Sequence, residues 1–253
     1  MHRLAPNLRS YGRAPFSVGV VHGGPGAAGE MAPVARQLAG RRDVLEPLQT
    51  ESSLDGQIEE LRLTVNPNGD LPLTLIGFSW GAWLSYIVAA RHPECVSKLI
   101  LVASGPFEDK YLARLRENRM ARLTAPQRTE YQSLVAALDN PVLGDPVLGD
   151  RDTALARLGT LASRSSQYDP LPDERDESEA LEIRGDIFQG IWKEAARLRT
   201  SGELLALGTR IECPVVAIHG DCDPHPAEGV REPLSRILPD FRFITLENCG
   251  HKP

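Results

Sequence analysis

Gly77-Phe78-Ser79-Trp80-Gly81 stands between an apolar run over residues 71–76 and a helix-compatible segment over residues 81–91. The pattern Gly-x-Ser-x-Gly is typical of a nucleophile elbow, a sharp turn from strand to helix that holds a serine at its tip. Glycines flank the serine because larger side chains would collide with the backbone there. The spacing alone also fits an ordinary strand-to-helix turn with a capping serine. The strand before it and the helix after it make Ser79 the predicted nucleophile.

Strand-like and helix-like segments alternate on both sides of this turn. Apolar runs of strand length are bounded by Gly, Pro and polar residues, and stretches with helical periodicity follow most of them. Such alternation predicts an α/β fold with a doubly wound, mostly parallel sheet that has helices on both faces. The predicted strands are residues 16–21, 44–48, 71–76, 96–102, 214–219 and 241–246, and the predicted helices are residues 27–38, 54–65, 81–91 and 228–237.

A helical insertion interrupts this pattern between residues 105 and 208. The strand signals stop after Ser104, and helices are predicted at residues 109–123, 127–138, 153–162 and 183–207. We therefore expect a doubly wound α/β core of residues 1–104 and 209–253, with residues 105–208 as a helical cap over the carboxyl ends of the strands. The near-duplicate segments 141–145 and 146–150 are predicted to be a loop, because two short copies cannot form a solenoid. The last helix of the insertion carries an apolar stripe that indicates core packing: Ile187, Ile191, Trp192, Ala195 and Leu198.

The composition excludes several classes of function. The chain has 253 residues, of which 42% are apolar, and a net charge of −6, so it can bury a core but has no basic stripe for a nucleic-acid partner. We find neither a secretory signal nor a run of about 18 apolar residues, and therefore expect a cytoplasmic protein that does not enter a membrane. Cys95, Cys213, Cys222 and Cys249 have no metal-ligand spacing and are expected to be reduced thiols.

The predicted nucleophile needs a general base and donors for an oxyanion. His251 is the best placed of the six histidines because it follows the last predicted strand after a short loop, at the edge where the elbow opens. The backbone N–H groups of Gly24, in the glycine-rich loop after the first predicted strand, and of Trp80 are predicted to form the oxyanion hole. Asp221 and Asp223 lie between the serine and the histidine in sequence and just after a strand, where the acid of a triad is expected.

Four motifs of the chain resemble the α/β-hydrolase superfamily, nearest its proline-iminopeptidase-like serine hydrolases. They are His-Gly-Gly-Pro-Gly at residues 22–26, Gly-Phe-Ser-Trp-Gly-Ala at 77–82, Gly-Asp-Cys-Asp at 220–223 and Gly-His-Lys-Pro at 250–253. The resemblance covers residues 16–104 and 213–253, and it implies that the acid is Asp223, the last residue of Gly-x-x-Asp. The implied triad is Ser79, Asp223 and His251. Phe78 departs from the proline iminopeptidases, which usually carry glycine at that position.

These residues predict a serine hydrolase that cleaves a carboxylic ester or related acyl bond of a small molecule through an acyl-enzyme, without a cofactor. A proline-iminopeptidase-type aminopeptidase is one alternative, but it needs a buried carboxylate for the substrate amine, and we expect residues 173–177 and Glu194 to face water. A non-hydrolysing ligand-binding module on the same fold is another. The bond type, the substrate and the oligomeric state stay open. A metal site is the last alternative, with its ligands drawn from His219, Asp221, Asp223 and His225.

Overall fold

A seven-stranded sheet forms the centre of the computed structural model, which describes residues 7–25, 27–139, 151–169, 182–183 and 185–253. The strand order is β1-β4-β2-β5-β6-β8-β9, and every neighbouring pair is parallel except β1 with β4. The prediction of a doubly wound, mostly parallel sheet is therefore confirmed. The strands are β1 (Leu8–Tyr11), β2 (Phe16–Val21), β4 (Val44–Pro47), β5 (Gly69–Phe78), β6 (Val96–Val102), β8 (Val215–Gly220) and β9 (Phe241–Leu246).

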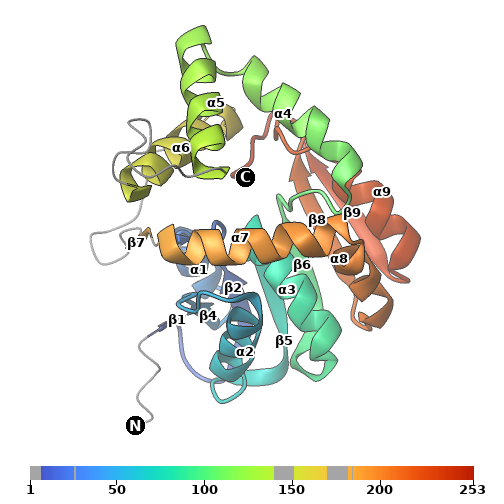
Figure 1. Cartoon of the computed structure of the whole chain (residues 1–253). Helices are drawn as coiled ribbons and strands as arrows, with labels where there is room; N and C mark the ends of the chain where they lie inside the picture. Colours follow the sequence, from blue (N-terminus) through green and yellow to red (C-terminus); the bar gives the residue numbers. More distant parts are fainter. Residues whose placement is uncertain (1–6, 26, 140–150, 170–181, 184) are drawn as a thin grey trace.

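Helices cover both faces of this sheet (Figure 1). One apolar cluster joins α2 (Leu54–Val65), α3 (Trp80–Arg91) and α9 (Glu228–Ile237) to one face. A second cluster packs α1 (Ala32–Ala39) against the other face. The sequence of α3 is apolar on every side, and each of its residues from Trp80 to Ala90 is buried, as expected of a helix in the centre of a core. This burial fixes the helix that begins directly after Ser79.

The segment between β6 and β8 is mainly helical in the described residues. It contains α4 (Leu112–Ala121), α5 (Ala125–Asp139), α6 (Arg151–Ser166), α7 (Gly185–Thr200) and the short α8 (Glu203–Ala206). Figure 1 shows α5 and α6 standing apart from the sheet, α4 running from them towards the side that carries β8 and β9, and α7 crossing between α5 and α6 and the core. The division into a core and a cap at residues 105 and 208 stays a prediction. Among the described residues, no helix is both long and apolar enough to cross a membrane.

Three short strands escaped the sequence prediction. β1 lies at the antiparallel edge, and β3 (Ala27–Ala28) pairs with β7 (Glu182–Ile183) in a separate two-stranded sheet. The expectation that no strand lies between residues 105 and 208 was therefore wrong. Because residues 27–28 pair with β7, the first helix begins at Ala32 rather than at residue 27. The near-duplicate segments at residues 141–150 lie outside the described residues.

The helix predicted over residues 183–207 is broken by a glycine with a positive φ. α7 ends at Thr200, and Gly202, with φ of 80°, precedes α8. Four members of its apolar stripe are buried, as predicted, but Trp192 is 45% exposed. The indole of Trp192 stacks on that of Trp83 in α3, with ring centroids 6.3 Å apart. The four buried residues of the stripe therefore pack in the core, while Trp192 lies at the edge of the core and remains partly exposed.

α7 is held against the amino-terminal end of α2 by two close contacts. A Cβ on Gly190 would lie 2.3 Å from the carbonyl oxygen of Ser52. One turn later, a carboxylate oxygen of Glu194 accepts a hydrogen bond from the backbone N–H of Leu54, at 3.1 Å. That N–H belongs to the first residue of α2 and has no partner within its own helix. Glu194 is therefore half-buried at a helix end, and the expectation that it faces water was wrong.

We expect Gly190→Ala to lower the free energy of unfolding by about 1–3 kcal/mol, because the new methyl group overlaps a backbone carbonyl that cannot move freely. The matched control is Gly159→Ala in α6, where a Cβ meets nothing within 4 Å. That change should raise the free energy of unfolding by up to about 1 kcal/mol, since alanine favours the helix. Urea denaturation of the two variants checks both values. Equal stability of the two would show that α7 does not rest on α2 at Gly190.

Candidate active site

Ser79 stands on a strained turn between β5 and α3. Its φ of 52° and ψ of −112° lie outside the regions that serine normally adopts. The turn is so tight that a Cβ on Gly77 would lie 2.2 Å from the carbonyl oxygen of Gly81. A Cβ on Gly81 would lie 2.3 Å from the carbonyl oxygen of Val21, at the end of β2. Both glycines of the motif are thus required by contacts on either side of the serine.

His251 places its imidazole against the hydroxyl of Ser79. Its Nε2 lies 3.0 Å from Ser79 Oγ. The histidine follows β9 after a short loop, and its backbone N–H donates to the carbonyl of Ser166 at the end of α6, at 2.8 Å. The ring of Phe78 lies beside it, with centroids 5.2 Å apart. A strand end, a helix end and an aromatic ring therefore hold this imidazole at the serine.

Asp223 lies on the other side of His251. Its Oδ2 is 2.7 Å from His251 Nδ1, and its side chain is fully buried. Burial alone would raise the pKa of this carboxyl, but the neighbouring His251 and His225 lower it well below its usual range. Because an ionised carboxylate only accepts hydrogen bonds, His251 Nδ1 carries a proton and Nε2 is free to accept one from Ser79. The three groups form a continuous hydrogen-bonded chain.

The second candidate acid, Asp221, hydrogen-bonds a backbone group instead of the imidazole of His251. It is exposed, and its Oδ1 accepts a hydrogen bond from the backbone N–H of Cys249, at 3.2 Å. This contact ties the loop after β8 to the loop after β9. Of these two carboxylates, only Asp223 is hydrogen-bonded to His251 in the part of the chain that the structure describes. Asp221 instead stabilises the contact between the two loops.

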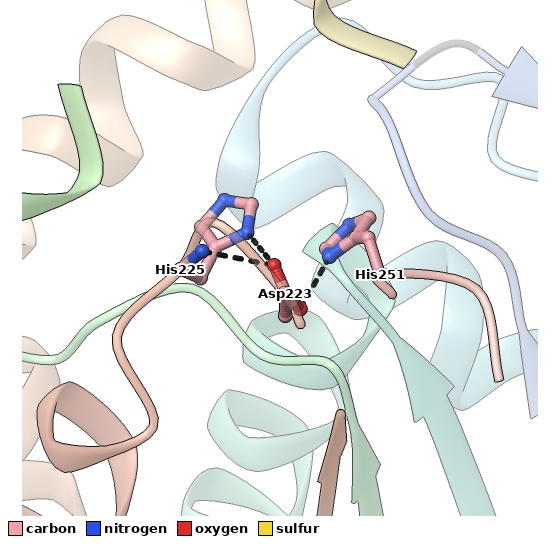
Figure 2. A group of neighbouring side chains, drawn as sticks. All are labelled: Asp223, His225 and His251. Atoms are coloured by element: carbon pink, nitrogen blue, oxygen red, sulfur yellow. Dashed lines mark hydrogen bonds and ion pairs between the residues drawn. The ribbon is translucent and has the colours of Figure 1, made fainter. Parts of the chain in front are cut away.

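Two more histidines surround Asp223, and sequence reasoning gave them no role in the triad. His225 Nδ1 lies 2.7 Å from Asp223 Oδ1, and the backbone N–H of His225 donates to the same oxygen at 2.9 Å. Figure 2 shows the carboxylate between His225 and His251. His219 Nε2 lies 3.5 Å from Asp223 Oδ2 and 2.9 Å from the carbonyl oxygen of His225. A histidine two residues after the acid was the only sequence signal for this arrangement.

The metal site considered from the sequence does not form as expected, because Asp221 and His219 are absent from the group of possible ligands that lie together among the described residues. Asp223, His225 and His251 do bring potential ligand atoms within 4.8 Å of one another. Two ligands of one tetrahedral zinc ion stand about 3.3 Å apart, given bonds of about 2.0–2.1 Å. The two nitrogen to oxygen distances of 2.7 Å are shorter and fit charge-assisted hydrogen bonds. We therefore interpret the cluster as a hydrogen-bonded network.

The loop after β2 lies against the elbow. His22 is fully buried, its Nε2 accepts a hydrogen bond from the backbone N–H of Gln49 at 3.0 Å, and its Nδ1 lies 2.9 Å from the carbonyl of Gly23. Burial lowers the pKa of His22, which keeps the imidazole neutral and suits it to bracing the loop. Gly24 has a positive φ of 36°, and Trp80 begins α3, where backbone N–H groups have no helical partner. The oxyanion-hole role of these two residues stays a prediction.

Curated relatives of the chain are esterases by name. The chain is 29% identical over 188 residues to a pimeloyl-[acyl-carrier protein] methyl ester esterase of Chromobacterium violaceum, a match that covers 72% of this chain and 64% of the relative. It is 24% identical over 216 residues to the protein of the same name from Neisseria meningitidis, covering 82% of this chain and 58% of the relative. The chain spans less than two thirds of the length of either relative.

Solved structures share the fold at low sequence identity. VinJ has a TM-score of 0.65 at 18% identity, covering 97% of this chain and 88% of VinJ. The epoxide hydrolase CorEH has a TM-score of 0.65 at 20% identity, covering 96% of this chain and 87% of that protein. At this low sequence identity, the two matches show that the chain shares their fold.

The family comparison covers most of the chain. Residues 18–253 match the family described as having the alpha/beta hydrolase fold. The match includes the elbow, the loop after β2 and both loops that carry Asp223 and His251. The superfamily resemblance of the four sequence motifs is thereby confirmed, whereas the relatives named above are esterases and not proline iminopeptidases. The chain belongs to the α/β-hydrolase fold family.

Proposed function

We propose that the chain is a serine hydrolase of carboxylic esters, with Ser79 as nucleophile, His251 as general base and Asp223 as the acid that orients the histidine. The observation that carries the proposal is the chain of contacts from Ser79 Oγ to His251 Nε2, at 3.0 Å, and from His251 Nδ1 to Asp223 Oδ2, at 2.7 Å. The position of Ser79 on a strained strand-to-helix turn supports the same proposal, because such a turn exposes a serine oxygen to substrate.

The proposed reaction proceeds through an acyl-enzyme. Ser79 Oγ attacks the ester carbonyl while His251 Nε2 takes the hydroxyl proton. The backbone N–H groups of Gly24 and Trp80 are proposed to donate to the oxyanion that forms. The imidazolium then gives its proton to the leaving alcohol, and the acyl group stays on Ser79. A water molecule, deprotonated by His251, releases the carboxylic acid and restores the serine.

An ester substrate is favoured over a peptide with a free amino terminus. The curated relatives are named as methyl ester esterases, which supports cleavage of an ester bond. An aminopeptidase must pair the substrate ammonium with a buried carboxylate, since an unpaired desolvated charge costs several kcal/mol. Glu194, the candidate identified in the sequence, already accepts a hydrogen bond from Leu54 at the start of α2. The acidic run at residues 173–177 lies outside the described residues.

Ser79→Ala is expected to lower kcat for aryl ester hydrolysis by about five orders of magnitude or more while the protein stays folded, because the change removes the attacking oxygen and little volume. A fluorophosphonate should label wild type at Ser79, as read by peptide mass spectrometry, and should not label the variant. Ser17→Ala, at an exposed position of β2, serves as the control and should keep full activity. Labelling of another residue would contradict the assignment of the nucleophile. A fully folded wild type that reacts with neither the probe nor any ester would instead favour a non-hydrolysing binding module.

Asp223→Asn is expected to lower kcat by about three to four orders of magnitude, since an amide cannot stabilise the imidazolium and favours the wrong histidine tautomer. Asp221→Asn is the matched control, because it changes a carboxylate two residues away that contacts the backbone of Cys249. It should lower kcat by less than about tenfold. Steady-state kinetics on one aryl ester measures both. Losses of similar size would contradict the assignment of Asp223, and the opposite order would identify Asp221 as the acid.

We expect aryl butyrate to be hydrolysed with a higher kcat/KM than prolyl arylamide, by about tenfold or more, because an unpaired ammonium is costly to desolvate. N-acetylprolyl arylamide separates the effect of the amine from that of the amide bond. A true aminopeptidase would prefer the free amine over its acetylated form. Such a preference, together with a prolyl arylamide rate above the ester rate, would make the chain an aminopeptidase.

A further inference from the structure

A second histidine shares the carboxylate of the proposed triad. Asp223 Oδ2 faces His251, while Oδ1 lies 2.7 Å from His225 Nδ1 and 2.9 Å from the backbone nitrogen of His225. The rings of His225 and His251 are 4.6 Å apart, on either side of the carboxylate. Figure 2 shows the two imidazoles on opposite sides of the Asp223 carboxylate. The proposed mechanism uses His251 and gives the imidazole of His225 no role.

The protonation of His225 follows from its partner. An ionised carboxylate only accepts hydrogen bonds, so His225 Nδ1 carries a proton and donates it. Burial lowers the pKa of His225 to about 4, although the Asp223 charge opposes this, so the ring is neutral at working pH. The side chain therefore supplies one hydrogen bond to Asp223 Oδ1 and no positive charge.

The ring of His225 is not needed to hold its own backbone. The carbonyl of His225 lies 2.9 Å from His219 Nε2, and its backbone N–H already bonds Asp223. The preceding carbonyl, of Pro224, accepts a hydrogen bond from the amide of Asn118 in α4, at 3.1 Å. Removing the imidazole leaves these three contacts in place. The ring can therefore be tested apart from the loop that carries it.

Four other groups contribute to the electrostatics of this pair. His219 on β8 lies 3.5 Å from Asp223 Oδ2, and His251 lies 2.7 Å from the same oxygen. The guanidinium of Arg119 on α4 contributes to lowering the pKa of His225, and the charge of Asp223 contributes to raising the pKa of the Cys249 thiol. None of the four donates a described hydrogen bond to Oδ1, which is contacted by His225 alone among the described residues.

We propose that His225 is a positioning residue: its imidazole N–H holds Asp223 Oδ1, so that Oδ2 is presented to His251 and part of the carboxylate charge is drawn away from His251. This inference rests on the proposed function of the triad. Without the imidazole, Oδ1 keeps only the backbone N–H of His225, so the carboxylate is held less firmly and more of its charge lies on Oδ2. The alignment of the base becomes poorer, and His251 holds a proton to higher pH. Both effects act on the chemical step and leave substrate binding unchanged.

His225→Leu and His225→Asn test this inference as a matched pair. The two side chains have the same branched shape, but only the amide of asparagine has a nitrogen where His225 carries Nδ1. The loss of a hydrogen bond to a charged group changes a rate constant by about tenfold to hundredfold. His225→Leu should therefore lower kcat by about that factor and leave KM unchanged. The acid limb of its kcat/KM profile should move to higher pH. His225→Asn should keep kcat within about threefold and retain the wild-type profile.

A readout independent of turnover separates this inference from the proposed function. The ring protons of His251, followed by NMR in the full chain, should titrate at higher pH in His225→Leu than in wild type or His225→Asn. Unchanged titration, or equal losses in both variants, would overturn the role of His225 even if esters are cleaved. Absence of ester cleavage with the expected titration shift would instead overturn the proposed function alone. His225→Ala, which also removes the donor, replaces His225→Leu if that variant fails to fold.

Discussion

The close approach of three backbone segments at Ser79 is the constraint on which the rest of the site depends. β5 turns into α3 so sharply that Gly77 and Gly81 nearly touch, and the end of β2 packs against Gly81. A residue other than glycine in a left-handed conformation costs roughly 1–2 kcal/mol, and Ser79 bears that strain. The turn persists because α3 is buried along its whole length and the backbone N–H of Ser79 bonds the carbonyl of Val102 at the end of β6. The core on both sides of the turn therefore holds the serine in place.

A buried charge imposes a second constraint on the loop after β8. The Asp223 carboxylate has no solvent exposure, and an isolated buried carboxylate would be protonated rather than tolerated. Donors from two imidazoles and one backbone N–H keep it ionised instead. Because each donor comes from a fixed position, the charge cannot relax by rotation. The same contacts that make burial tolerable thus set the direction in which Asp223 faces His251.

The sequence predicts this site where local pattern and local chemistry agree. Strand, turn and helix follow one another around Ser79, so the elbow could be located from periodicity and glycine spacing alone. The pairing of β3 with β7 joins residues more than 150 positions apart and leaves no local signal in two-residue strands. Asp221 and Asp223 could not be separated by pattern alone, since the choice depends on contacts with the loop after β9. The exposure of Trp192 likewise depends on how α7 is rotated against α3.

The helices between β6 and β8 contact the proposed catalytic loops directly. α6 ends at Ser166, whose carbonyl accepts a hydrogen bond from the backbone N–H of His251. Just beyond it, the hydroxyl of Tyr168 donates to the side chain of Asn248, in the loop that leads to His251. α4 reaches the acid loop through Asn118. α7, by contrast, is held to the start of α2 at Gly190. A displacement of α4 or α6 must therefore strain the hydrogen bonds that position His251 and Asp223, whereas α7 can stay on the core. α4 thus hydrogen-bonds the loop that carries Asp223, and α6 hydrogen-bonds His251 itself, so a change in the position of either helix also affects the alignment of the acid with the base.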